Sequence, residues 1–129
     1  MMRLYNTDSK GNAFLPDVID AVWKKARTVP GTDPEQVRKD PCGAWIERKN
    51  FGKTTHMGTG WEIDHIFPVE RGGTDKLNNL QALQWENNRQ KGNSFVLKCY
   101  VSYQHQVFPI AKKTEKVIAL ILAFVLSSI

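Results

Sequence analysis

Four polar residues between positions 61 and 92 have types and an order that suit the hydrolysis of a phosphodiester. Asp64 and His65 stand together at the end of an apolar, β-branched run, Asn79 precedes a short apolar segment, and Asn88 lies in a polar, helix-prone run. Carboxylate and amide oxygens suit Mg²⁺ or Mn²⁺, and a neutral imidazole is a competent general base. A hard cation would neutralise charge on the phosphoryl oxygens and on the departing alkoxide. These residues therefore predict a metal-assisted phosphodiesterase site.

Two strands and a helix are expected to carry these side chains. In chain order the pattern predicts a strand over residues 61–67, a polar loop over 70–79, a strand over 80–84 and a helix over 85–91. In an ideal strand, Asp64 and His65 point to opposite faces. Both serve one site only if the strand bends or twists there, or if the ion sits at the edge of the strand.

The part of the chain before this unit is expected to be mainly helical. The pattern predicts a helix over residues 17–26, a short helix over 33–38 with Asp33 as its N-cap, and a strand over 44–49. Residues 94–103 have strand character. No internal repeat or low-complexity linker divides the chain.

The order of these elements and polar residues resembles the HNH endonuclease family. The matching positions are Asp64-His65-Ile66, Pro68, Gly72-Gly73, Asn79-Leu80, Asn88 and Lys91-Gly92. The resemblance implies an α+β fold, with a ββα-metal (HNH/His-Me finger) motif that follows an N-terminal helical segment. It divides the chain into an N-terminal extension (residues 1–13), an HNH nuclease domain (14–94) and a C-terminal extension with an apolar tail (95–129).

The resemblance also implies a role for each residue of the motif. His65 would be the general base that takes a proton from the attacking water, and Asn79 would fix the His65 ring by hydrogen bonding. Asp64 and Asn88 would hold one divalent cation, Mg²⁺ or Mn²⁺. Many family members carry histidine where Asn88 stands, and an amide is a weaker ligand for transition metals, so a Zn²⁺- or Ni²⁺-dependent mechanism is not expected.

The charge of the chain favours an anionic partner. Eighteen Lys and Arg against thirteen Asp and Glu give a formal net charge of +5. By resemblance, Arg89 and Lys91 would lie near a phosphate backbone, and the partner would be nucleic acid, with DNA ahead of RNA. The alternative is a catalytically inactive nucleic-acid-binding module on the same scaffold, which would bind in a salt-sensitive way without metal-dependent turnover.

The cysteines and the N-terminus predict a cytoplasmic protein. Cys42 and Cys99 stand far apart without a Cys-x-x-Cys partner, so we expect two free thiols in a reducing compartment and neither a zinc ribbon nor a disulfide framework. The first eight residues lack the apolar region of a secretory signal.

The C-terminal tail is a separate feature. Residues 117–129 are almost wholly apolar and follow Lys112, Lys113 and Lys116. As a helix they would span about 20 Å, short of the ~20 residues that a bilayer crossing needs. We expect a buried terminal element or a contact with a second copy of the chain. The alternatives are a tail that docks on a membrane or a partner, and an end that does not belong to the ancestral domain.

Overall fold

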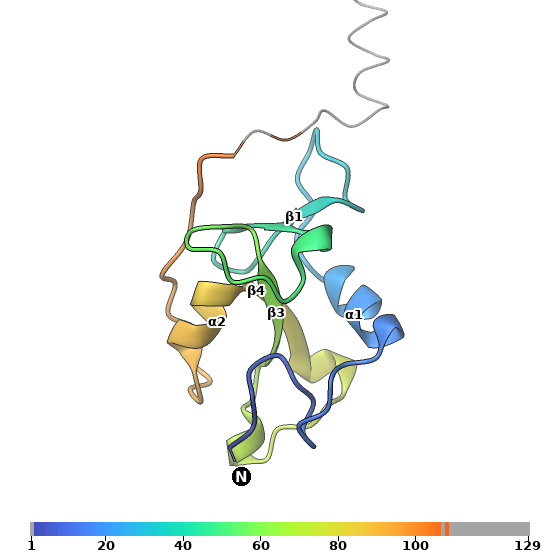
Figure 1. The fold of residues 1–129 in the computed structure, drawn as a ribbon, viewed down its shortest axis with the longest axis vertical. Coiled ribbons are helices and arrows are strands. Elements are labelled where there is room, and N and C mark those ends of the chain that lie inside the picture. Colours follow the sequence, from blue (N-terminus) through green and yellow to red (C-terminus); the bar gives the residue numbers. More distant parts are fainter. Residues whose placement is uncertain (1, 107, 109–129) are drawn as a thin grey trace, which may run out of the picture.

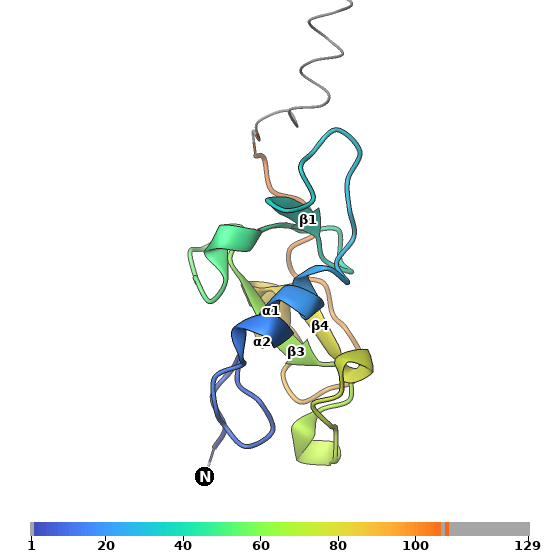
Figure 2. The ribbon, with the colours of Figure 1, turned by 90° about the vertical axis from the view of Figure 1, so that its right-hand side faces the viewer.

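The computed structural model describes residues 2–106 and 108, and its helices and small antiparallel sheets form an α+β fold (Figures 1 and 2). The elements in chain order are α1 (Pro16–Trp23), β1 (Val37–Lys39), β2 (Trp45–Glu47), β3 (Trp61–His65), β4 (Leu80–Gln84) and α2 (Trp85–Lys91). Short 3-10 turns occupy Arg48–Asn50, Val69–Arg71 and Leu77–Asn79. The expected α+β class is therefore confirmed, as are the predicted strand over 80–84 and the predicted helix over 85–91.

The centre of the fold is the antiparallel hairpin of β3 and β4, whose register runs from Trp61 opposite Gln84 to His65 opposite Leu80. Figure 1 shows α1 and α2 on opposite sides of this hairpin, and Figure 2 agrees with that arrangement. On the α1 side, Trp23 packs against Trp61 with ring centroids 5.3 Å apart, and both side chains are fully buried. Burying an aromatic side chain of this size stabilises a fold by roughly 1.5–3 kcal/mol, so this packing fixes α1 on the hairpin.

The predicted helix over residues 33–38 is wrong, because long-range pairing replaces it. Arg38 and its neighbours form β1, which pairs antiparallel with β2. The carbonyl of Pro34 accepts hydrogen bonds from Trp23 Nε1 at 2.9 Å and from Arg38 Nε at 2.8 Å. These contacts occupy the Pro34 carbonyl, which a helix continuing to residue 38 would use as a backbone hydrogen-bond acceptor. Residues 94–103 likewise form no strand, although strand character was expected there.

The prediction of two free thiols is also wrong, because Cys42 and Cys99 form a disulfide with their Cα atoms 5.5 Å apart. Asn87 on α2 brings the two cysteines together. Its amide donates to the Val101 carbonyl at 2.7 Å and accepts from the Tyr100 and Val101 N–H groups. Disulfides persist mainly in oxidising compartments, so the cysteines no longer support a cytoplasmic location.

Asp40 connects the elements around this disulfide. The side chain is fully buried, and burial raises its pKa, an effect that four hydrogen bonds oppose. One carboxylate oxygen accepts from the Cys42 and Ala44 N–H groups, and the other accepts from Gln84 N and Asn87 Nδ2. Asp40 therefore ties the β1–β2 turn to the start of α2.

We expect Asp40→Ala to lower the free energy of unfolding by about 3 kcal/mol or more, because it leaves buried donors without an acceptor. Urea denaturation of the full chain measures this effect. Asp20→Ala is the matched control: Asp20 pairs with Lys24 on the exposed face of α1, and such pairs contribute only about 0.3–0.5 kcal/mol. Equal losses in the two variants would contradict this role for Asp40.

The described part of the chain contains no helix that is both long and apolar enough to cross a membrane. A buried terminal element or a contact with a second copy was expected for residues 117–129, with docking on a membrane or a partner as the alternative. These residues lie outside the described part of the chain.

Candidate active site

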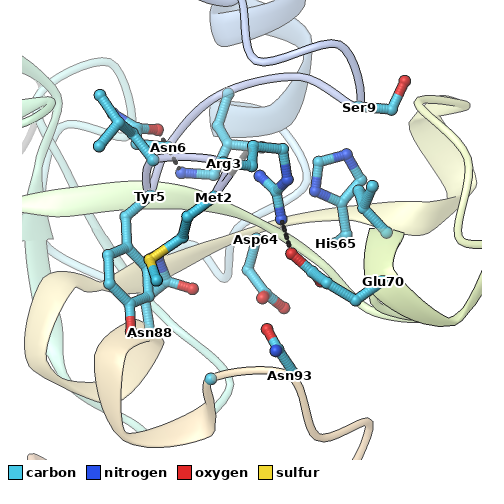
Figure 3. Close-up of a pocket in the computed structure, with 14 residues that line it drawn as sticks. Met2, Arg3, Tyr5, Asn6, Ser9, Asp64, His65, Glu70, Asn88 and Asn93 are labelled. Atoms are coloured by element: carbon cyan, nitrogen blue, oxygen red, sulfur yellow. Dashed lines mark hydrogen bonds and ion pairs between the residues drawn. The ribbon is translucent and has the colours of Figure 1, made fainter.

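A pocket of about 440 Å³ opens at the edge of β3. One edge of β3 pairs with β4, and the other borders an N-terminal segment (residues 2–9), where Asn6 Oδ1 accepts a hydrogen bond from the Ile63 N–H at 2.8 Å. The pocket is lined by Asp64, His65 and Asn88, and by residues of the N-terminal segment (Figure 3). Three of the predicted site residues therefore meet in one place.

The position of this pocket removes the geometric conflict between Asp64 and His65. Asp64 turns toward α2, where it contacts Lys91, whereas His65 packs against Phe14 with ring centroids 6.0 Å apart. The two side chains thus leave β3 in different directions, as expected for neighbours on a strand. A cavity at the edge of the strand is accessible to both of them, so no sharp bend in β3 is needed.

Asp64 is buried and paired. Lys91 Nζ lies 3.2 Å from the carboxylate, and Gln81 Nε2 donates to it at 3.0 Å. Burial raises the pKa of Asp64, while the hydrogen bond from Gln81 and the charge of Lys91 oppose that rise. Lys91 is itself buried and also donates to the His65 carbonyl at 3.0 Å. The ammonium group of Lys91 is therefore directed into the protein, where it contacts Asp64 and the His65 carbonyl.

His65 is held by Asp75 and not by Asn79. The His65 Nε2 atom lies 2.8 Å from Asp75 Oδ1. The Asn79 amide instead donates to the carbonyls of Phe67 and Thr74 and accepts from the Phe67 N–H. The expected hydrogen bond from Asn79 to the His65 ring is thus wrong. Asn79 stabilises the loop that contains Asp75, and the only signal for Asp75 in the sequence was a carboxylate within that polar loop.

Asn88 presents an oxygen atom that is free to bind a ligand. Its Nδ2 atom donates to Glu62 Oε1 at 3.0 Å, which leaves Oδ1 as an acceptor without a partner among residues 2–106 and 108. Arg89, the next residue, pairs with Glu62 at 3.1 Å and stacks on Tyr5 with 4.6 Å between its guanidinium and the ring centroid. The side chain of Arg89 is 41% exposed, so it remains available to a large anionic partner.

Arg3 adds a positive charge to the same pocket, and sequence reasoning gave no signal for it. Its guanidinium donates to the Thr7 carbonyl at 2.9 Å and pairs with Glu70 at 3.3 Å. The Nε atom of Arg3 is buried, and no hydrogen-bond partner for it is found in the described part of the chain. Figure 3 shows Arg3 close to Asp64 and His65.

The donor atoms of the pocket fit a hard divalent cation. Mg²⁺ is commonly held by one or two carboxylates, with water and substrate phosphates completing its shell. Asp64 supplies a carboxylate, and Asn88 supplies an amide oxygen that has no other partner within the described residues, which matches that chemistry. Within the described ranges, no group of three or more His, Cys, Asp or Glu side chains has an arrangement that could hold a metal ion. Any ion bound here would therefore depend on water and on the substrate for most of its ligands.

Comparison with known proteins bears on the same segment. Residues 47–94 match the family model described as HNH endonuclease. No curated protein and no solved structure gives a match. The matched range contains β3, β4 and α2, and with them Asp64, His65, Asn79 and Asn88. The resemblance of residues 47–94 to this family is therefore confirmed.

Proposed function

We propose that the protein is a divalent-metal-dependent endonuclease that hydrolyses phosphodiester bonds of nucleic acid, with DNA as its substrate. The observation that carries the proposal is the meeting of Asp64, His65 and Asn88 in one pocket at the edge of β3. In this proposal β3, β4 and α2 are the ββα-metal motif, and residues 14–94 are the nuclease domain.

His65 acts as the general base in this mechanism. Its ring is anchored at Nε2 by Asp75, so Nδ1 is the nitrogen that takes a proton from the attacking water. A base of this kind contributes about 10²- to 10⁴-fold to a rate. Packing of the ring against Phe14 limits its rotation, which keeps the base in position.

Asp64 and Asn88 would hold the cation, Mg²⁺ or Mn²⁺. When bound, such an ion supplies charge neutralisation at the phosphoryl oxygens and at the leaving oxygen. Burial raises the pKa of Asp64, and the hydrogen bond from Gln81 and the charge of Lys91 oppose that rise. Arg89 contacts the phosphate backbone outside the pocket, where its half-exposed guanidinium lies.

Cleavage of supercoiled plasmid by the purified chain tests the proposal. We expect Mg²⁺ or Mn²⁺ to convert the plasmid to nicked or linear forms, EDTA to stop the reaction, and excess Mg²⁺ to restore it. A parallel assay on structured RNA tests the choice of DNA. Salt-sensitive DNA binding without cleavage in either metal would overturn the proposal and favour an inactive binding module.

A further inference from the structure

We propose that Asp75 is a positioning residue that selects the tautomer of His65, and that Ser9 of the N-terminal segment holds Asp75 in place for this task. The inference rests on the proposed function for its effect on cleavage. Its effect on the His65 ring is independent of that function.

The Asp75 carboxylate receives three hydrogen bonds. Ser9 N donates to Oδ1 at 2.9 Å, Ser9 Oγ donates to Oδ2 at 2.5 Å, and His65 Nε2 lies 2.8 Å from Oδ1. Ser9 and Asp75 are separated by 66 positions in the chain. A segment distant from the HNH motif in sequence thus holds the partner of the proposed base.

Asp75 is an acceptor in all three contacts. Burial by itself would raise the pKa of Asp75, but the hydrogen bonds from Ser9 and His65 outweigh burial and lower that pKa. The group is therefore ionised at neutral pH, and an ionised carboxylate can only accept hydrogen bonds. The hydrogen atom of this contact consequently lies on His65 Nε2.

This protonation pattern decides which nitrogen of His65 can act as a base. A neutral imidazole carries one N–H group and one lone pair, so with the hydrogen on Nε2 the lone pair lies on Nδ1. No hydrogen-bond partner for Nδ1 is found among residues 2–106 and 108, and His65 lines the pocket. Figure 3 places the His65 ring between Ser9 and Asp64. Asp75 thus directs the free lone pair toward the proposed site of water activation.

Other contacts of His65 do not set the tautomer. Phe14 packs on the ring at 6.0 Å between centroids but offers no hydrogen-bonding group, and Lys91 contacts only the His65 backbone carbonyl. Replacing Asp75 by Ala would remove the only carboxylate that bonds the ring in the described part of the chain. The tautomer should then shift toward the mixture that a free imidazole adopts.

The test combines NMR with kinetics on the full chain. ¹⁵N spectra of the metal-free protein at alkaline pH report the tautomer of each neutral imidazole. The His65 signals are assigned by their loss in His65→Ala. We expect an Nε2–H pattern in the wild type and a mixed pattern in Asp75→Ala.

Plasmid cleavage is the second measurement. Loss of such a supporting contact typically costs about 10- to 100-fold in activity. We expect this loss in kcat, with KM changed by less than about twofold, since Asp75 contacts no substrate.

Two further variants keep the test decisive. Ser9→Ala removes only the hydroxyl donor and should lower kcat less than Asp75→Ala does, while Asp75→Asn keeps an acceptor oxygen without the charge and should fall between them. These variants replace Asp75→Ala if that variant does not fold. Asp20→Asn, on the exposed face of α1, is the matched control and should leave the tautomer and kcat unchanged.

The outcomes separate the two proposals. A wild-type His65 that carries its hydrogen on Nδ1 would overturn the role of Asp75, as would an unchanged tautomer and kcat in Asp75→Ala and Asp75→Asn. A wild-type protein that cleaves no nucleic acid but shows the Nε2–H pattern, lost in Asp75→Ala, would overturn the nuclease and support the positioning of the ring.

Discussion

Replacing His65 by Ala is expected to lower metal-dependent plasmid cleavage by about 10²- to 10⁴-fold, the range that a general base contributes. The loss should appear in kcat, because the proposed cation ligands Asp64 and Asn88 and the charge of Arg89 remain. Single-turnover cleavage in Mg²⁺ measures it. His65 is 3% exposed and packs on Phe14, so truncation leaves a cavity. His65→Asn fills more of that space, and it should be equally inactive while retaining the native thermal transition.

His56→Ala is the matched control for this experiment. His56 is an exposed histidine outside the pocket, where it pairs with Glu86 at 2.9 Å. Its loss should leave the cleavage rate within about twofold, because it contacts neither the proposed cation ligands nor His65. Full activity in a folded His65→Asn protein would show that another group is the base. Residual activity shared by all variants would instead indicate a contaminating nuclease.

Removing the disulfide is expected to have the largest effect on stability. The bond between Cys42 and Cys99 closes a loop across 57 positions, and a loop of that length corresponds to about 4 kcal/mol of unfolding free energy in the chain-entropy model. Urea denaturation of wild type against the double variant Cys42→Ser/Cys99→Ser measures the difference. The wild type with reductant should approach the double variant, and reductant should not affect the variant itself.

The state of the cysteines can be checked directly. Thiol labelling of the urea-unfolded wild type without reductant should detect no free thiol, and labelling after reduction should detect both. Free thiols before reduction, or equal stability of the wild type with and without reductant, would contradict the disulfide as a stabilising element.

The disulfide also bears on the geometry of the site. Asn87 links α2 to Val101 near Cys99 and to Asp40 near Cys42. Asn88, the next residue, contributes its side chain to the pocket. The network around the disulfide therefore holds the start of α2 against β3, where the spacing between Asp64 and Asn88 is set.

Local sequence determined the central elements of the domain and most of its polar site. Leu80 to Gln84 and Trp85 to Lys91 have the bounds that their pattern predicted. Strand and helix patterns depend on neighbours within a few residues. The helix ends before Gly92, because glycine adopts backbone conformations that terminate a helix and that other residues avoid. Asp64, His65 and Asn88 follow from the same local units, and so does the resemblance to the HNH endonucleases.

Tertiary structure alone decided what surrounds those residues. The pairing of Cys42 with Cys99, the bond from Ser9 to Asp75 and the burial of Lys91 beside Asp64 join positions 57, 66 and 27 apart in the chain. No periodicity reports contacts over such separations. The same limit explains the helix expected over residues 33–38, where the Asp33-Pro34 start signal was local but pairing with β2 was not. Sequence thus identified candidate residues for the chemistry. Long-range packing decided that Asp64, His65 and Asn88 line one pocket and that Lys91 is buried beside Asp64.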